Sequence, residues 1–270
     1  IRENGKLIHV TKLGPTKGYK RPARNSSLAE HYCTPAEMDA CNTIFTEILP
    51  ELSSMNIEEL SRFSKGLEII RLEGGIDDFW DLQGDLNSTT NQEKFKTIQN
   101  IGNLESYPGI RDLIKKVIID NDRAAFIEIS GLSYLKDKSV LNEINKDFTI
   151  KGQPNEFNGM GFVNDEKYLA EVKSLAGFGD PLGNLKTLPD AADWVNSHIK
   201  EQLDGIKSEI ETGNDDFTEV KRVKIIVPKS QYTFVLSDGR KVGEALDKIR
   251  SYTGYPFKIE LEVIPESYVR

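Results

Sequence analysis

The chain has 270 residues, of which 38% are hydrophobic, 9% aromatic and 29% charged, and its formal net charge is -8. This composition is typical of a folded globular protein, and no apolar run approaches the roughly 20 residues of a membrane span, which excludes an integral membrane protein. The acidic balance argues against a protein that coats nucleic acid through a broad basic surface, but it allows a local basic cleft. The length is sufficient for two domains, and we expect a boundary after residue 104.

The N-terminal stretch is predicted to be irregular and basic. Glu3 and Glu30 stand against seven cationic side chains before residue 31: Arg2, Lys6, Lys12, Lys17, Lys20, Arg21 and Arg24. Such an arm is either a solvated tail or a segment that contacts phosphate or a membrane surface. The two cysteines, Cys33 and Cys41, are spaced for a small disulfide loop, and two buried free thiols are the alternative.

Residues 1–104 are expected to form a mainly helical leader. A helix begins at Thr34, which precedes a proline at the first helical position and a glutamate three residues after the cap. A second helix is predicted to begin at Asn56 and to end at Gly74, with apolar residues at helical spacing between them. The segment 77–99 is polar and mixed, and residues 87–92 within it are predicted to be a loop.

Residues 105–270 carry a different pattern, in which helices and strands alternate. The predicted helices and strands are, in chain order, helices at 108–120 and 122–135, strands at 148–151, 156–162 and 168–174, a helix at 189–211, a strand at 223–227, a helix at 243–252 and a strand at 257–263. This order favours an α/β class with a mixed sheet.

The most informative segment is the third predicted strand. Side chains alternate along a strand, so Glu171 and Lys173 share one face, whereas Tyr168, Ala170 and Val172 share an apolar one. A carboxylate beside an ammonium, with another acidic or amide group near, is what metal-assisted phosphodiester hydrolysis requires. The alternative is a solvated strand face or a cross-strand ion pair.

The element order, with Glu-x-Lys on the third strand, resembles the restriction-endonuclease-like fold of the PD-(D/E)xK nucleases over residues 108–270. Ala124 to Glu128 resembles the helical Glu motif of that superfamily. Glu156 to Gly159 lies where its members commonly have an aspartate, and Ala170 to Ser174 matches the Glu-x-Lys signature. The combination is more specific than the tripeptide alone.

The resemblance implies roles for individual residues. Glu171 would bind a divalent ion, Mg²⁺ or Mn²⁺, and Lys173 would act on the attacking water or the transition state. Glu128 would complete the acidic cluster, unless it is an ordinary glutamate on a helix surface. Gln202 on the following helix is a further candidate.

One position departs from the family pattern, because Asn158 stands where the metal-binding aspartate is expected. An amide oxygen can ligate a hard cation, but it lacks the negative charge of a carboxylate. Either Glu156 on the same strand face supplies that charge as a metal ligand, or the site is naturally degenerate, or the chain is an inactivated form of a toxic enzyme. These three interpretations stay open.

The organisation is similar to the C-terminal toxin regions of contact-dependent growth inhibition and related polymorphic bacterial toxins. This likeness implies a part of a larger secreted or cell-surface protein, consistent with a start at Ile1, that acts on DNA or tRNA in the target-cell cytoplasm. It also implies a cognate immunity protein that blocks the cleft. A non-catalytic interaction domain on a degenerate nuclease scaffold is the alternative from another class.

Overall fold

The computed structural model of the chain describes residues 2–3, 6–7, 49–73, 91–119, 122–150, 152–174, 188–235, 239 and 241–269. The predictions for Cys33, Cys41, the helix start at Thr34 and most of the basic arm lie outside these residues. In the arm, β1 (Arg2–Glu3) and β2 (Lys6–Leu7) form a short antiparallel pair where the sequence predicts no regular structure.

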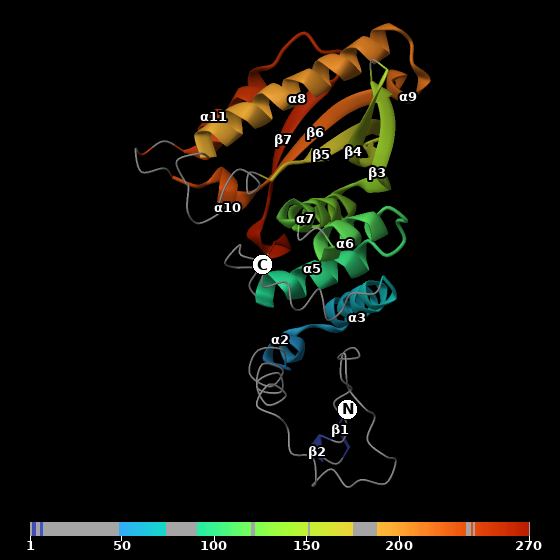
Figure 1. The fold of residues 1–270 in the computed structure, drawn as a ribbon, viewed down its shortest axis with the longest axis vertical. Helices are drawn as coiled ribbons and strands as arrows, with labels where there is room; N and C mark the ends of the chain where they lie inside the picture. The colour runs from blue at the N-terminus through green and yellow to red at the C-terminus, as the bar shows by residue number, and fades with distance from the viewer. Residues whose placement is uncertain are drawn as a thin grey trace.

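A mixed five-stranded sheet forms the centre of the fold, in the order β3-β4-β5-β6-β7 (Figure 1). Its strands are β3 (Val140–Ile150), β4 (Gln153–Val163), β5 (Glu166–Val172), β6 (Val220–Pro228) and β7 (Lys258–Ile264). The first three are antiparallel neighbours, whereas β6 runs parallel to β5 and β7 parallel to β6. The predicted α/β class with a mixed sheet is confirmed.

The hairpin between β4 and β5 turns at Asn164 and Asp165. Both residues have positive φ angles, 50° and 62°, which is the geometry of a two-residue hairpin turn whose twist matches its strands. Asparagine and aspartate tolerate this conformation better than most residues. The turn therefore fixes the register between β4 and β5, and in this register residue 171 lies at the end of the hairpin away from the turn.

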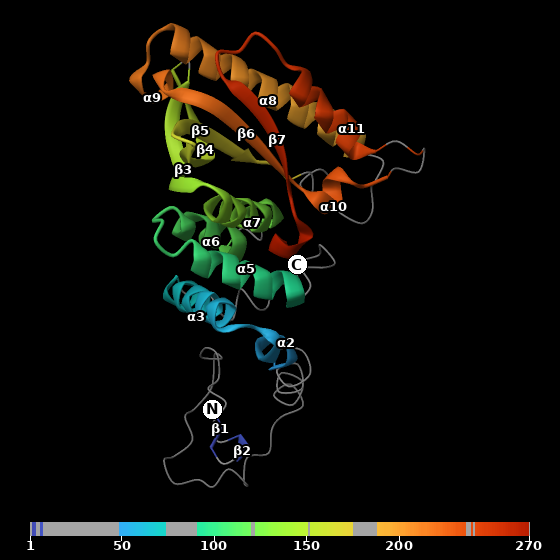
Figure 2. The ribbon, with the colours of Figure 1, turned by 180° about the vertical axis from the view of Figure 1, so that it is seen from behind.

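Helices cover both faces of the sheet, as Figures 1 and 2 show from opposite sides. One face is covered by α7 (Arg123–Lys138), and the other by α8 (Leu188–Glu211) together with α11 (Val242–Leu246) and the 3-10 turn η4 (Asp247–Ser251). The short helices α9 (Asp215–Thr218) and α10 (Lys229–Tyr232) flank β6, and η5 (Glu266–Tyr268) follows β7.

Alternation along β5 divides its side chains between the two faces. Tyr168, Ala170 and Val172 belong to the hydrophobic cluster on the α7 side, and Leu169 to the cluster on the α8 side. The apolar face predicted for this strand is therefore confirmed. Glu171 is expected on the α8 side by the same alternation.

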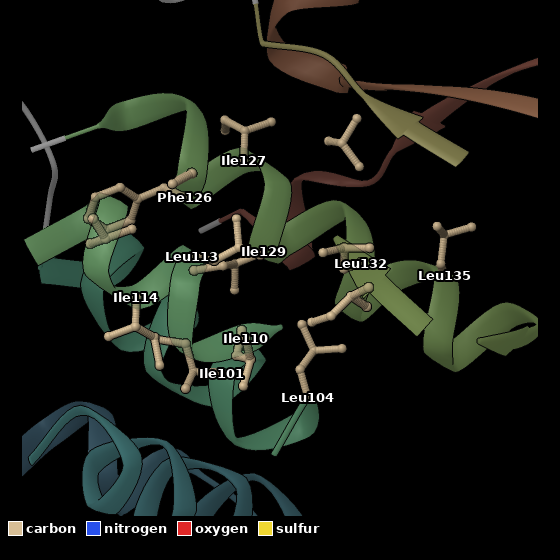
Figure 3. Packing of buried hydrophobic residues seen from close by; sticks show 14 of the residues in the cluster. Ile101, Leu104, Ile110, Leu113, Ile114, Phe126, Ile127, Ile129, Leu132 and Leu135 are labelled. Atoms are coloured by element: carbon tan, nitrogen blue, oxygen red, sulfur yellow. The ribbon is translucent and has the colours of Figure 1, made fainter. Parts of the chain in front are cut away.

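Behind α7 lies a stack of helices. It contains α2 (Leu49–Ser54), α3 (Ile57–Leu72), α5 (Asn91–Asn103) and α6 (Ile110–Ile119). Figure 3 shows Ile101, Leu113 and Ile129 gathered between α5, α6 and α7, and all three are fully buried. The hydrophobic cluster continues without a break from α3 to the sheet. The domain boundary after residue 104 stays a prediction.

Helix α3 begins where the sequence predicts, since the Asn56 side chain caps it in a reciprocal capping box with Glu59. Where α3 crosses α5, the backbones of the two helices are in direct contact at two glycines. A Cβ atom added at Gly66 would lie 1.9 Å from the Ile98 carbonyl oxygen, and one at Gly102 would lie 1.7 Å from that of Arg62. No side chain other than hydrogen fits at either glycine while the helices keep this distance.

The sequence prediction of a loop through residue 92 is wrong at its end, because α5 begins at Asn91. The helix is polar, yet most of its described side chains are buried between α3 and α7. Asn100 donates to the Tyr268 carbonyl oxygen at 2.8 Å, and Asn103 to the Ser133 hydroxyl at 2.9 Å. These buried polar residues interrupt the apolar pattern of Phe95, Ile98 and Ile101, so the hydrophobic pattern alone marks the helix only weakly.

Within the described ranges, none of the helices combines the length and the apolar character that a bilayer crossing needs.

Candidate functional site

The candidate site lies where β4 and β5 separate. Their pairing runs from the hairpin turn as far as Gly159 opposite Ala170. Beyond that pair, the Asn158 side-chain oxygen accepts a hydrogen bond of 2.7 Å from the Val172 backbone N–H. Strand β5 continues beside β6, since the Lys173 N–H donates to the Ile226 carbonyl oxygen at 2.8 Å. The Asn158 amide therefore replaces the backbone ladder at the point where the strands part.

The predicted pair of Glu171 and Lys173 lies at this separation and is buried. The Lys173 ammonium donates to Glu171 Oε1, and only 7% of the Glu171 side chain and 16% of the Lys173 side chain are exposed. Glu171 Oε2 is buried without a hydrogen-bond partner among the described residues. Because both charges are largely removed from water, this pair differs from an ion pair on a solvated strand face.

Helix α7 contributes Glu128, the third predicted site residue. Its Oε2 is buried and has no hydrogen-bond partner in the described part of the chain. Burial raises the pKa of the Glu128 carboxyl to about 7, the charge of Lys116 lowers it, and the charge of Glu171 raises it. The Glu171 carboxylate is therefore close enough for its charge to act on the Glu128 carboxyl.

Glu156 of β4 lies at the rim of this cluster. It is exposed, and its Oε1 is 3.5 Å from the ammonium of Lys116 on α6. Its charge also raises the pKa of Glu128, although less than that of Glu171 does. The structure thus places Glu156 near the site but pairs it with a lysine that sequence reasoning missed. No local motif marks Lys116, whose position depends on the packing of α6 on α7.

Helix α8 carries two further polar residues, of which His198 is near enough for the charges of Lys173 and Glu171 to act on it. Gln202 Oε1 is buried without a partner among the described residues. Burial lowers the pKa of His198, the charge of Lys173 lowers it further, and that of Glu171 raises it. Sequence reasoning considered Gln202 and missed His198 as a site residue. The available signal was its spacing, one helical turn before Gln202.

The oxygen donors at the site fit a hard divalent ion, although the described residues contain no group of three or more His, Cys, Asp or Glu side chains that could hold a metal. Glu171 and Glu128 each offer an unpartnered carboxylate oxygen, and Asn158 adds an amide oxygen. Magnesium is commonly held by one or two carboxylates together with water and substrate phosphate. A site for Mg²⁺ or Mn²⁺ remains a prediction.

No family model, curated protein or solved structure matches this chain. The likeness to the PD-(D/E)xK nucleases therefore rests on the motif residues and the element order alone, and stays a hypothesis.

Proposed function

We propose that the chain is a divalent-metal-dependent nuclease of the PD-(D/E)xK type. The observation that carries this proposal is the buried pair of Glu171 and Lys173, with Glu171 Oε2 left without a partner where β4 and β5 separate. Burying two charges costs free energy that a hydrophobic pair would not. Such an arrangement, with a strongly perturbed carboxyl beside it, is typical of a functional site.

The order of the elements supports the same proposal. An antiparallel series of three strands follows α7, and α8 then leads to β6, which runs parallel to β5. This is the order that the resemblance implies for the nuclease fold, with Glu-x-Lys at the end of the third strand.

The side chains of the site have distinct chemical roles in this proposal. Glu171 Oε2, Glu128 Oε2 and the Asn158 amide oxygen would hold a divalent ion, which when bound polarises the scissile phosphate and lowers the pKa of a water molecule. The Lys173 ammonium, which donates to Glu171, can orient the water and stabilise charge that develops on the phosphate. Glu128, whose pKa is about 7, can exchange a proton near neutral pH.

The proposal extends to the biological setting. A nuclease of this organisation would cut DNA or tRNA in a target bacterial cell and would be neutralised by an immunity protein that covers the site. This extension is supported by the likeness in organisation, in which helices precede the sheet that carries the candidate site.

The test is cleavage of plasmid DNA and total tRNA in the presence of Mg²⁺, Mn²⁺ or EDTA. The double change Glu171→Ala, Lys173→Ala is expected to reduce cleavage by at least about a thousandfold, because it removes a metal ligand and a stabilising cation together. The matched control is Glu143→Ala, Lys146→Ala, which removes an exposed glutamate and lysine 2.8 Å apart on β3. Equal cleavage by the two double variants would contradict the proposed site.

Asn158→Asp is expected to increase metal-dependent cleavage, because a carboxylate adds negative charge for the cation. A carboxylate oxygen can also accept the Val172 N–H hydrogen bond, so the strand geometry can persist. An unchanged rate would mean that Asn158 does not occupy the metal-binding position.

The alternative function is a non-catalytic interaction domain, and the structural use of the Asn158 amide favours it. If wild type and Asn158→Asp are both silent on DNA and tRNA, while titration calorimetry detects no Mn²⁺ binding, the nuclease proposal fails and this alternative stands.

A further inference from the structure

A nucleic acid that approaches the candidate site meets negative charge. The charges of Glu171, Asp122 and Glu156 all act on Glu128, and the chain as a whole carries a net charge of -8. Two carboxylates and a phosphodiester backbone repel one another, so productive binding needs cations beside the site as well as within it.

Lys173 is poorly suited to attract the substrate from solution. Its side chain is only 16% exposed, and its ammonium already donates to Glu171 within the same strand. To move toward a phosphate outside the site, it would have to leave a buried carboxylate without a counter-charge, which is costly.

Lys116 is held differently. Its side chain is 38% exposed, its partner Glu156 is 40% exposed, and their closest approach is 3.5 Å. An exposed ion pair of this kind contributes little net free energy, so exchange of the carboxylate for a phosphate costs little. A phosphate also carries negative charge and accepts hydrogen bonds from an ammonium.

The position of Lys116 is fixed by the packing of α6. Leu113 and Val117 of this helix are fully buried in the cluster that α6 shares with α7. Among the charged neighbours of Glu128, Lys116 has the largest influence on that carboxyl. The ammonium therefore extends from a helix whose buried face is fixed against α7, and it lies 3.5 Å from Glu156 Oε1 at the rim of the site, while its flexible stem can follow a bound strand.

We propose that Lys116 binds a phosphate of the nucleic-acid substrate next to the bond that is cut, and that Glu156 is its partner only until the substrate arrives. This inference rests on the proposed nuclease function and specifies how that site receives its substrate. Lys116 is a positioning residue in this scheme. Glu156 is a competitor of the substrate phosphate and is not a metal ligand.

The decisive comparison is Lys116→Ala against Lys115→Ala. Lys115 is the adjacent residue on α6, is 52% exposed and pairs with Asp112, so its removal changes the net charge equally. Lys116→Ala is expected to raise KM about tenfold and to change kcat less than about threefold, because a lost charge-assisted contact affects substrate binding most. The slope of log affinity against log salt concentration should fall by about one unit.

Lys115→Ala is expected to leave KM, kcat and the salt slope unchanged. Lys116→Arg should keep the wild-type KM, since arginine also binds phosphate. The unfolding midpoint of each variant in urea separates a lost contact from a lost fold. The variants are made in the form that cleaves nucleic acid, which is either the wild type or Asn158→Asp.

Glu156→Gln tests the second half of the inference. Removing the competing carboxylate frees Lys116 and should lower KM severalfold, with the Mg²⁺ dependence unchanged. A lower kcat together with a higher Mg²⁺ requirement would show that Glu156 is a metal ligand and would overturn its role as competitor.

Binding of a fluorescein-labelled DNA duplex and of labelled tRNA in EDTA, followed by anisotropy, separates this inference from the nuclease proposal. If the parent cuts nucleic acid and Lys116→Ala behaves as Lys115→Ala in both assays, the Lys116 contact is refuted and the nuclease stands. If binding weakens only in Lys116→Ala but no form cuts, the contact stands and hydrolysis fails. If no form binds or cuts, both are refuted.

Discussion

Helix α7 contributes to two buried polar clusters that differ in how completely their hydrogen bonds are made. Toward α5, Ser130 and Ser133 each accept from an asparagine, at 3.3 Å from Asn100 and 2.9 Å from Asn103. None of these four side chains has a buried atom without a partner. Toward the sheet, Glu128 presents a buried oxygen that has none within the described residues.

The difference separates a polar cluster whose hydrogen bonds are made from one that keeps unused hydrogen-bonding capacity. Buried polar groups with partners contribute modest net stability and fix the register of two helices. Buried carboxylate oxygens without partners reduce stability, and under the proposed function those of Glu128 and Glu171 would bind a divalent ion. Each prediction below perturbs one of the two clusters and measures stability.

The largest effect is expected from Glu128→Gln, which removes the buried carboxylate. The folded pKa of Glu128 is raised from 4.5 to about 7, so its stabilising contribution is complete below pH 4.5 and is lost as the pH rises through 7. At pH 8 in EDTA the variant should exceed wild type in unfolding free energy by at most about 3 kcal/mol, and the difference should vanish by pH 4.5.

Urea unfolding between pH 4.5 and 8 measures this difference. The exposed Glu68 on α3 provides the control, and Glu68→Gln is expected to change little at any pH. A pH-independent difference between Glu128→Gln and wild type would mean that the Glu128 carboxyl titrates normally.

A smaller effect of opposite sign is expected in the other cluster. Asn100→Ala removes donors to the Tyr268 carbonyl oxygen and the Ser130 hydroxyl, and should reduce the unfolding free energy by about 2 kcal/mol. The loss should not depend on pH or on Mg²⁺, because no carboxylate is involved. The control is Ser64→Ala on the exposed side of α3. A loss of stability in Asn100→Ala that depends on Mg²⁺ would show that the Asn100 cluster is coupled to the cluster around Glu128.

The smallest effect is expected from Asn158→Asp in EDTA. The new carboxylate joins Glu171 and Glu128 in a buried place, but its hydrogen bond from the Val172 N–H becomes charge-assisted, so the net loss should be about 1 kcal/mol. Mg²⁺ should restore the melting temperature of this variant more than NaCl of equal ionic strength does. Equal responses to the two salts would show that the carboxylate does not bind the cation.

The fold could be predicted where apolar periodicity and capping residues mark the elements. Asn56 begins α3, and the spacing of apolar residues gave α6, α7 and α8. Helix α5 was not predicted because several of its buried residues are polar, among them Asn100 and Asn103, which donate to Ser130 and Ser133 of α7. Only the end of β3 was predicted, because its first half lacks a continuous apolar run.

The candidate site was predictable only in part. The spacing of Glu171 and Lys173 predicted that their side chains lie together on one face of a strand, because alternation along a strand is a local property. The bond from Val172 to Asn158 depends on where two strands part, and Lys116 depends on the docking of α6. Neither follows from neighbouring residues in the sequence, so both required the assembled fold.

The crossing of α3 and α5 has a consequence for recognising distant relatives of this chain. Because each of Gly66 and Gly102 lies against a carbonyl oxygen of the opposite helix, a Cβ atom at either position separates the helices. A relative that has lost all overall sequence similarity but retains this helix pair must still carry glycine at both positions. A protein that keeps this crossing is therefore constrained at two positions that no property of the candidate site would single out.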